Sequence, residues 1–129
     1  MESFTRKSRP KYLDLLRISL PVTGWVSIAH RVSGVGMIFL LPFFLYGLDT
    51  SLSGPPGFLR IRVWCSSFPG NLLVLAGLLA LAHHVIAGLR FLLLDIHVGS
   101  ELEQARRVAK AIIMADAVIL VILANWLLL

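Results

Sequence analysis

Three long runs of apolar residues, separated by short polar segments, dominate the sequence. Residues 32–48 and 71–89 carry no charged side chain, and residues 111–129 carry only Asp116. Apolar residues fill these runs continuously, whereas a helix on the surface of a soluble protein has them on one face only. About 20 such residues span the hydrocarbon core of a bilayer as an α-helix. The pattern therefore predicts an all-α integral membrane protein, built as a three-helix bundle.

The flanking residues define the limits of these helices within a single membrane-anchor domain. We expect a basic arm and three spans, at about 1–24, 25–48, 69–95 and 108–128 of the domain 1–129. The first uncharged run is slightly short of a full crossing, so its helix should begin before Arg31. Pro42 should bend that helix, because proline removes a backbone hydrogen bond. Residues 58–65 are compatible with a short surface helix or with a loop.

Basic residues are distributed unevenly among the segments that flank the spans. Those before the first span and between the second and third are Arg6, Lys7, Arg9, Lys11, Arg17, Arg106, Arg107 and Lys110. The segment between the first and second spans carries only Arg60 and Arg62. Because Lys and Arg favour the cytoplasmic side, the N-terminus is predicted to lie inside and the C-terminus outside.

Composition agrees with a membrane protein and narrows the possible functions. Hydrophobic residues make up 57% of the chain and charged residues 15%. The net charge of +5 does not indicate nucleic-acid binding, because the apolar runs divide the basic residues. A single cysteine, Cys65, argues against a cysteine-ligated metal. The N-terminus matches neither a signal peptide nor a good transit peptide, which favours a bacterial cytoplasmic (inner) membrane over the mitochondrial inner membrane.

Polar side chains inside the spans need a reason, because a charge at the bilayer centre costs about 2.5–3.5 kcal/mol. His84 lies eleven residues before Asp95, which places it roughly 16 Å from that end of the span, near mid-membrane. The residues on or beside its helix face are small, namely Gly77, Ala80, Ala87 and Gly88. Such a strip serves either close helix packing or the binding of a flat ligand.

Two interpretations of His84 follow from the residues alone. A porphyrin would suit the small-residue strip, because haem iron takes an axial imidazole and the apolar ring faces belong in hydrocarbon. The alternative is a structural histidine that hydrogen-bonds a neighbouring helix. His83 is the less favoured ligand, because its own face carries Arg90 and bulkier residues.

A second polar group is expected where the first span begins. Ser27 and Arg31 are four residues apart and share a helix face, with His30 beside them. A hydroxyl, an imidazole and a guanidinium would suit haem propionates or a quinone carbonyl. An arginine at this depth also commonly extends to lipid phosphate. Both interpretations stay open at this point.

Three further residues have simpler expected roles. Arg90, together with Asp95, should mainly anchor the second span at the membrane surface. Asp116 should lie close enough to the inner surface to meet Lys110 or a basic residue of a partner. Cys65 is expected to be inert.

Two motifs carry a resemblance to a known family. S-I-A-H-R-V-S at 27–33 and H-V-I-A-G-L-R-F at 84–91 resemble the two signatures of the succinate dehydrogenase cytochrome b subunit family. Arg9-Pro10 and the loop SLSGPPGF resemble other parts of that pattern, so the resemblance covers nearly the whole chain. Lys11 and Phe91 depart from residues that are common in the family.

The resemblance implies a function within an enzyme complex. The chain would be one of two small membrane anchors of respiratory complex II, a succinate:ubiquinone oxidoreductase of the tricarboxylic acid cycle and aerobic respiration. Its implied partners are a flavoprotein subunit that oxidises succinate, an iron–sulfur subunit and a second hydrophobic anchor subunit. The chain would not itself carry the succinate-oxidising site. The alternatives are a cofactor-free structural anchor and a homodimeric b-type cytochrome.

The resemblance also implies roles for individual residues. His84 would be an axial ligand of the iron of haem b, with the second histidine supplied by the other anchor. His30, Arg31 and the small residue Gly88 would border the haem. Ser27, Ile28 and Arg31 would line the ubiquinone site.

Overall fold

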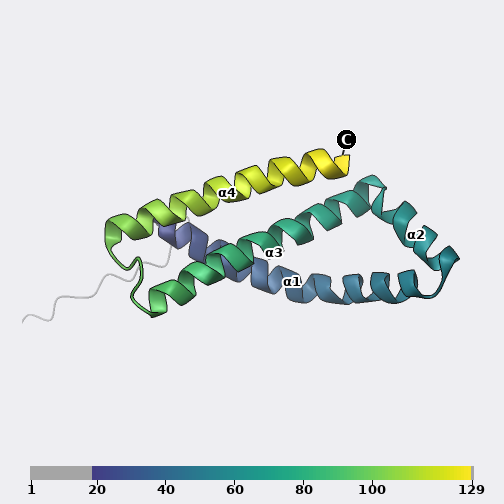
Figure 1. Ribbon diagram of the computed structural model, residues 1–129, viewed down its shortest axis with the longest axis horizontal. Helices are drawn as coiled ribbons and strands as arrows, with labels where there is room; N and C mark the ends of the chain where they lie inside the picture. Colours follow the sequence, from purple (N-terminus) through teal and green to yellow (C-terminus); the bar gives the residue numbers. More distant parts are fainter. Residues whose placement is uncertain (1–18, 129) are drawn as a thin grey trace, which may run out of the picture.

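The computed structural model describes residues 19–128, and their secondary structure is entirely helical (Figure 1). The helices are α1 (Val22–Leu52), α2 (Pro55–Cys65), α3 (Phe68–Asp95) and α4 (Leu102–Leu128). Of these, α1, α3 and α4 are long and apolar enough to cross a membrane. The helical class and the three candidate spans agree with the sequence. Most of the predicted basic arm, with Arg9-Pro10, lies outside the described residues.

Helix α1 is longer than predicted at both ends. It begins after Pro21. The backbone of this residue is extended, and its carbonyl group accepts the first hydrogen bonds of the helix. It continues through Pro42 without interruption of the helix and ends where the Ser53 amide donates to the Thr50 carbonyl, 3.2 Å away. The apolar run therefore forms only the central part of a helix of 31 residues.

Residues 58–65, for which the sequence allowed either a short surface helix or a loop, belong to helix α2. Gly54, at a φ of 122°, turns the chain, and Pro55 at the first helical position has a φ suited to a helix start. A Cβ on Gly57 would collide with the Thr50 carbonyl, and one on Gly70 would collide with the Trp64 carbonyl. Glycine at these positions lets α2 pack closely against the end of α1 and the start of α3.

The three long helices pack side by side, and α3 contacts both α1 and α4 (Figure 1). Their buried apolar core is Val26, Ala87, Ala109 and Ile112. These residues lie near the start of α1, the end of α3 and the start of α4, opposite the end that carries α2. The core thus brings three chain segments together close to the predicted inner membrane surface.

Most large apolar side chains of the spans are exposed in the single chain. Ile38 of α1 is 71% exposed and Trp126 of α4 is 75% exposed. A soluble protein does not cover its surface with such residues, whereas hydrocarbon or apolar subunits are suitable neighbours. The exposed surface therefore agrees with an environment of lipid and partner helices.

Candidate functional site

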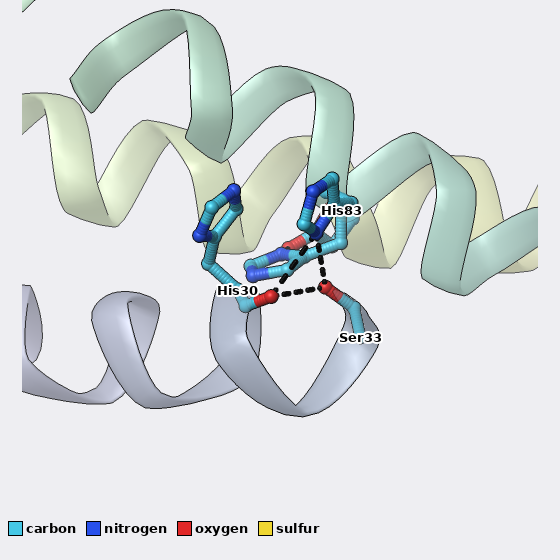
Figure 2. A network of polar contacts seen from close by, with 5 residues as sticks. His30, Ser33 and His83 are labelled. Carbon is cyan, nitrogen blue, oxygen red and sulfur yellow. Dashed lines mark hydrogen bonds and ion pairs between the residues drawn. The ribbon is translucent and has the colours of Figure 1, made fainter. Parts of the chain in front are cut away.

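Two helices meet through a polar cluster that contains His84. Its Nδ1 lies 3.1 Å from the backbone carbonyl oxygen of His30 and 3.2 Å from the Ser33 Oγ (Figure 2). The Ser33 hydroxyl donates its own hydrogen to the same His30 carbonyl, 2.8 Å away. Because a carbonyl oxygen can only accept, His84 must donate from Nδ1. In the neutral imidazole, the free lone pair then lies on Nε2.

The side chain of His30 stacks on this imidazole. The two ring centroids are 4.1 Å apart and the planes differ by 13°. Phe91 lies beside His30, with its ring centroid 5.2 Å away. The stack covers ring faces, whereas a ring nitrogen binds a metal through its in-plane lone pair. The contact with His30 therefore does not use the coordinating position of His84.

Two glycines make room for the stacked rings. A Cβ on Gly34 would lie 2.9 Å from Cε1 of His84, and one on Gly88 would lie 3.3 Å from Nε2 of His30. Each glycine thus lies against the imidazole of the opposite helix. Sequence reasoning singled out Gly88 as a binding residue but gave no role to Gly34, which directly follows the first motif.

Other members of the small-residue strip pack within the chain. A Cβ on Gly77 would be 2.7 Å from the ring of Phe44, and Ala87 is fully buried in the core. At these two positions the structure shows close helix packing, one of the two uses that the sequence left open. The space next to His84 is defined instead by Gly34 and Gly88.

The neighbouring histidine faces a different helix. Nδ1 of His83 lies 2.7 Å from Oδ2 of Asp116 on α4. Among the described residues, Nε2 of His83 and Oδ1 of Asp116 are buried and have no hydrogen-bond partner. Successive residues of a helix point in directions about 100° apart. His83 therefore contacts α4, whereas the adjacent His84 contacts α1. Among the described residues, Asp116 thus pairs with His83 and not with Lys110, one of the two partners that the sequence suggested.

The remaining predicted residues lie on α1, close to this cluster in sequence. Ser27 is half-buried, and Ile28 and Arg31 are exposed. Arg90 is only 8% exposed and its guanidinium lies 5.2 Å from the centroid of the Phe91 ring, while its role as an anchor at the membrane surface stays a prediction.

The match to known proteins extends over nearly the whole chain. Residues 5–124 match the family described as succinate dehydrogenase/fumarate reductase transmembrane subunit. The chain belongs to this family. The resemblance carried by the two motifs is therefore confirmed, and the chain is a membrane subunit of such an enzyme complex and not its catalytic subunit.

Two bacterial members of the family are similar over their full length. The succinate dehydrogenase cytochrome b556 subunit of Paracoccus denitrificans is 29% identical over 122 residues, which cover 95% of this chain and 94% of that protein. The succinate dehydrogenase cytochrome b556 subunit of Coxiella burnetii is 25% identical over 120 residues, covering 92% and 96%. In both comparisons the aligned residues cover more than nine-tenths of this chain and of the relative.

Proposed function

We propose that this chain is the cytochrome b anchor subunit of a succinate:ubiquinone oxidoreductase. It holds haem b together with a second anchor subunit and contributes to the site of ubiquinone reduction. The observation that carries the proposal is the hydrogen bond from Nδ1 of His84 to the His30 carbonyl. The name cytochrome b556, given to both relatives, supports a b-type haem.

The hydrogen bonding of the His84 imidazole is suited to an axial haem ligand. Histidines that bind a metal usually donate their other N–H to a carbonyl or a carboxylate, which sets the tautomer and the orientation of the ring. His84 has this arrangement, and its Nε2 lone pair is free to coordinate. Nε2 of His83 is instead buried within the chain. Bound there, haem b would accept and release single electrons.

One ligand from this chain is sufficient when a second anchor supplies the other. The described residues contain no group of three or more His, Cys, Asp and Glu side chains that would hold a metal ion alone. A six-coordinate haem needs only two axial ligands, which two subunits can share. We assign His30, Arg31 and Gly88 to the border of this haem. The side chains of His30 and Arg31 would bind its propionates.

The start of α1 is suited to a quinone. Ser27 offers a hydroxyl and Arg31 a guanidinium, and both are donors to a quinone carbonyl. Ile28 would add an apolar wall. Arginine keeps its proton, so Arg31 would stabilise the developing negative charge, and the two protons of the reduction would come from water near the membrane surface.

The partners and the membrane follow from the same assignment. A flavoprotein subunit, an iron–sulfur subunit and a second hydrophobic anchor would complete the assembly. The bacterial relatives favour the bacterial inner membrane as its location. The predicted orientation places the N-terminus and the beginning of α1 inside, where the iron–sulfur subunit would dock.

The test compares the two adjacent histidines in the complete complex. His84→Ala should lower the haem b content per complex at least about tenfold, because its metal ligand is lost. His83→Ala is the matched control and should retain haem. The measurement is the reduced-minus-oxidised absorption spectrum, normalised to the amount of the flavoprotein or the iron–sulfur subunit. A normal spectrum in His84→Ala would refute the ligand assignment.

The same preparations separate the alternatives. A cofactor-free anchor predicts a parent complex without b-type absorption bands. A homodimeric cytochrome predicts that this chain, expressed without the second anchor, retains its haem. The proposed heterodimeric site predicts haem in the parent complex and its loss when the second anchor is omitted.

A further inference from the structure

The corner between α1, α2 and α3 encloses a cavity that no proposed haem or quinone contact uses. Its volume is about 550 Å³. It is formed by the end of α1, by α2 and by the beginning of α3, at the end of the bundle that carries α2 and away from the buried core.

The interior of the cavity is apolar. Its walls include Phe43, Phe44, Leu48, Ile61, Leu73 and Val74. Thr50 and Ser51 also line the cavity, but apolar surface dominates its lining. A hydrocarbon chain gains by leaving water for this kind of surface. The interior therefore selects an aliphatic occupant.

The lining of the cavity also contains one cation and two aromatic residues that carry polar groups. Arg60 lines it together with Tyr46 and Trp64, and Arg60 is exposed. The lining residues include this cation and no carboxylate. Tyr and Trp are typical of the headgroup level of membranes, where one side of the ring is apolar and the other is wet. The occupant should therefore combine an aliphatic tail with an anionic head.

We propose that this cavity binds an anionic phospholipid of the leaflet at the α2 end. One acyl chain fills the apolar interior, and the headgroup phosphate binds Arg60. Guanidinium groups pair with phosphate through two parallel hydrogen bonds, and the net negative charge of an anionic headgroup, which a zwitterionic lipid lacks, adds attraction to the cation. The lipid would fill the space between α2 and the two spans α1 and α3, which the side chains of this chain leave open.

The first test fills the cavity with a side chain. Gly47 lines the cavity, whereas Gly36 is on the same helix outside it, and a Cβ at either position meets nothing within 4 Å. The complete complexes with Gly47→Met and with Gly36→Met are delipidated, reloaded with dioleoylphosphatidylglycerol and examined by native mass spectrometry. Gly47→Met should lose the retained lipid, and Gly36→Met should keep it.

The second test removes the charge. Arg60→Gln should reduce the preference for dioleoylphosphatidylglycerol over dioleoylphosphatidylcholine about fivefold, since a basic residue at a membrane surface contributes about 1 kcal/mol toward anionic lipid. Arg62→Gln, on the same helix but not in the cavity lining, should leave it unchanged. Haem content and ubiquinone reduction are controls for assembly and should stay at parent values.

Three results would overturn the proposal. These are unchanged lipid retention in Gly47→Met, equal preference in Arg60→Gln and the parent, and retention of a quinone or a neutral lipid instead of phosphatidylglycerol. Each is independent of the haem spectrum, so a failure here differs from a failure of the proposed function.

Discussion

The two ends of the helix bundle are held together in different ways. Near the predicted inner surface, four small or apolar core residues pack the three long helices, and the nearby His84 and His83 bind α1 and α4 through hydrogen bonds. At the other end, α2 packs tightly against its neighbours but leaves a cavity of about 550 Å³. Hydrogen bonds thus hold the helices together near the proposed haem site, where a cofactor would require a fixed geometry. Beside α2 the helices leave a cavity, which a lipid of variable conformation could fill.

Polar contacts inside a membrane define a particular helix arrangement more strictly than apolar packing does. Apolar side chains have similar neighbours in lipid and in protein, whereas a buried imidazole without a partner loses its hydrogen bonds. His83 contacts Asp116 on α4, and His84 contacts the His30 carbonyl and the Ser33 hydroxyl on α1. Variants of these contacts should therefore have larger effects than equal changes at the cavity end.

The largest effect is expected from Gly34→Val. Its Cβ would lie 2.9 Å from Cε1 of His84, so the imidazole has to move away from the His30 carbonyl. We expect loss of most haem b and a destabilisation of roughly 1–3 kcal/mol, as for other overpacked sites. Haem absorbance and the thermal midpoint of the purified complex measure both. Gly36→Val is the control, and equal effects of the two variants would contradict the assigned contact.

A large effect on one activity is expected from Arg31→Gln. Loss of a charged donor costs about 1.5–3 kcal/mol, so ubiquinone reduction by succinate should fall at least about tenfold. Electron transfer from succinate to a soluble dye that accepts electrons before the membrane subunits should be unchanged. Arg62→Gln, exposed at the other end, should affect neither rate. A parallel fall of both rates in Arg31→Gln would indicate an assembly defect instead of a quinone contact.

An intermediate effect is expected from Asp116→Ala. The substitution leaves His83 buried without its partner, which costs roughly 1–3 kcal/mol of stability. The double variant His83→Ala with Asp116→Ala should be less destabilised than the sum of the single variants, because no unpaired group remains. Thermal unfolding of the complex measures the coupling. Additive effects would mean that the two side chains do not interact in the assembled protein.

The smallest effect is expected from Ser33→Ala. Ser33 is a second acceptor for His84, which keeps its bond to the His30 carbonyl. We expect a loss of about 0.5–1 kcal/mol, with haem content close to the parent value. Ser100→Ala, at an exposed hydroxyl, is the control for thermal unfolding. Loss of haem in Ser33→Ala would show that the hydroxyl, and not the carbonyl, sets the position of the ring.

The spans were predictable because their pattern is local. Continuous apolar runs of membrane-crossing length require no knowledge of neighbours, and the three long helices contain all of them. The helix ends were less predictable, since Pro21 and Ser53 lie in polar segments beyond the runs. Helix α2 could not be chosen over a loop, because its close packing depends on Gly57 and Gly70 meeting carbonyls of other segments.

The candidate site was predictable only in part. The two motifs singled out His30 and His84, and the structure brings these rings into contact. Sequence reasoning gave no roles to Ser33 and Gly34 and expected a different partner for Asp116. Proximity in the chain suggests Lys110 for this carboxylate, but the partner is His83, 33 residues away. No periodicity along one helix indicates such a pair.

The sequence alone determined that the chain lies in a membrane, how many apolar helices it has and which imidazoles require explanation. These properties depend on the free energy of transfer of each segment into hydrocarbon, which is a sum over its own residues. Only the tertiary structure decided that His84 contacts α1, that His83 contacts α4 and that a cavity remains beside α2. Those outcomes depend on the relative rotation and approach of helices, which side chains distant in the sequence determine together.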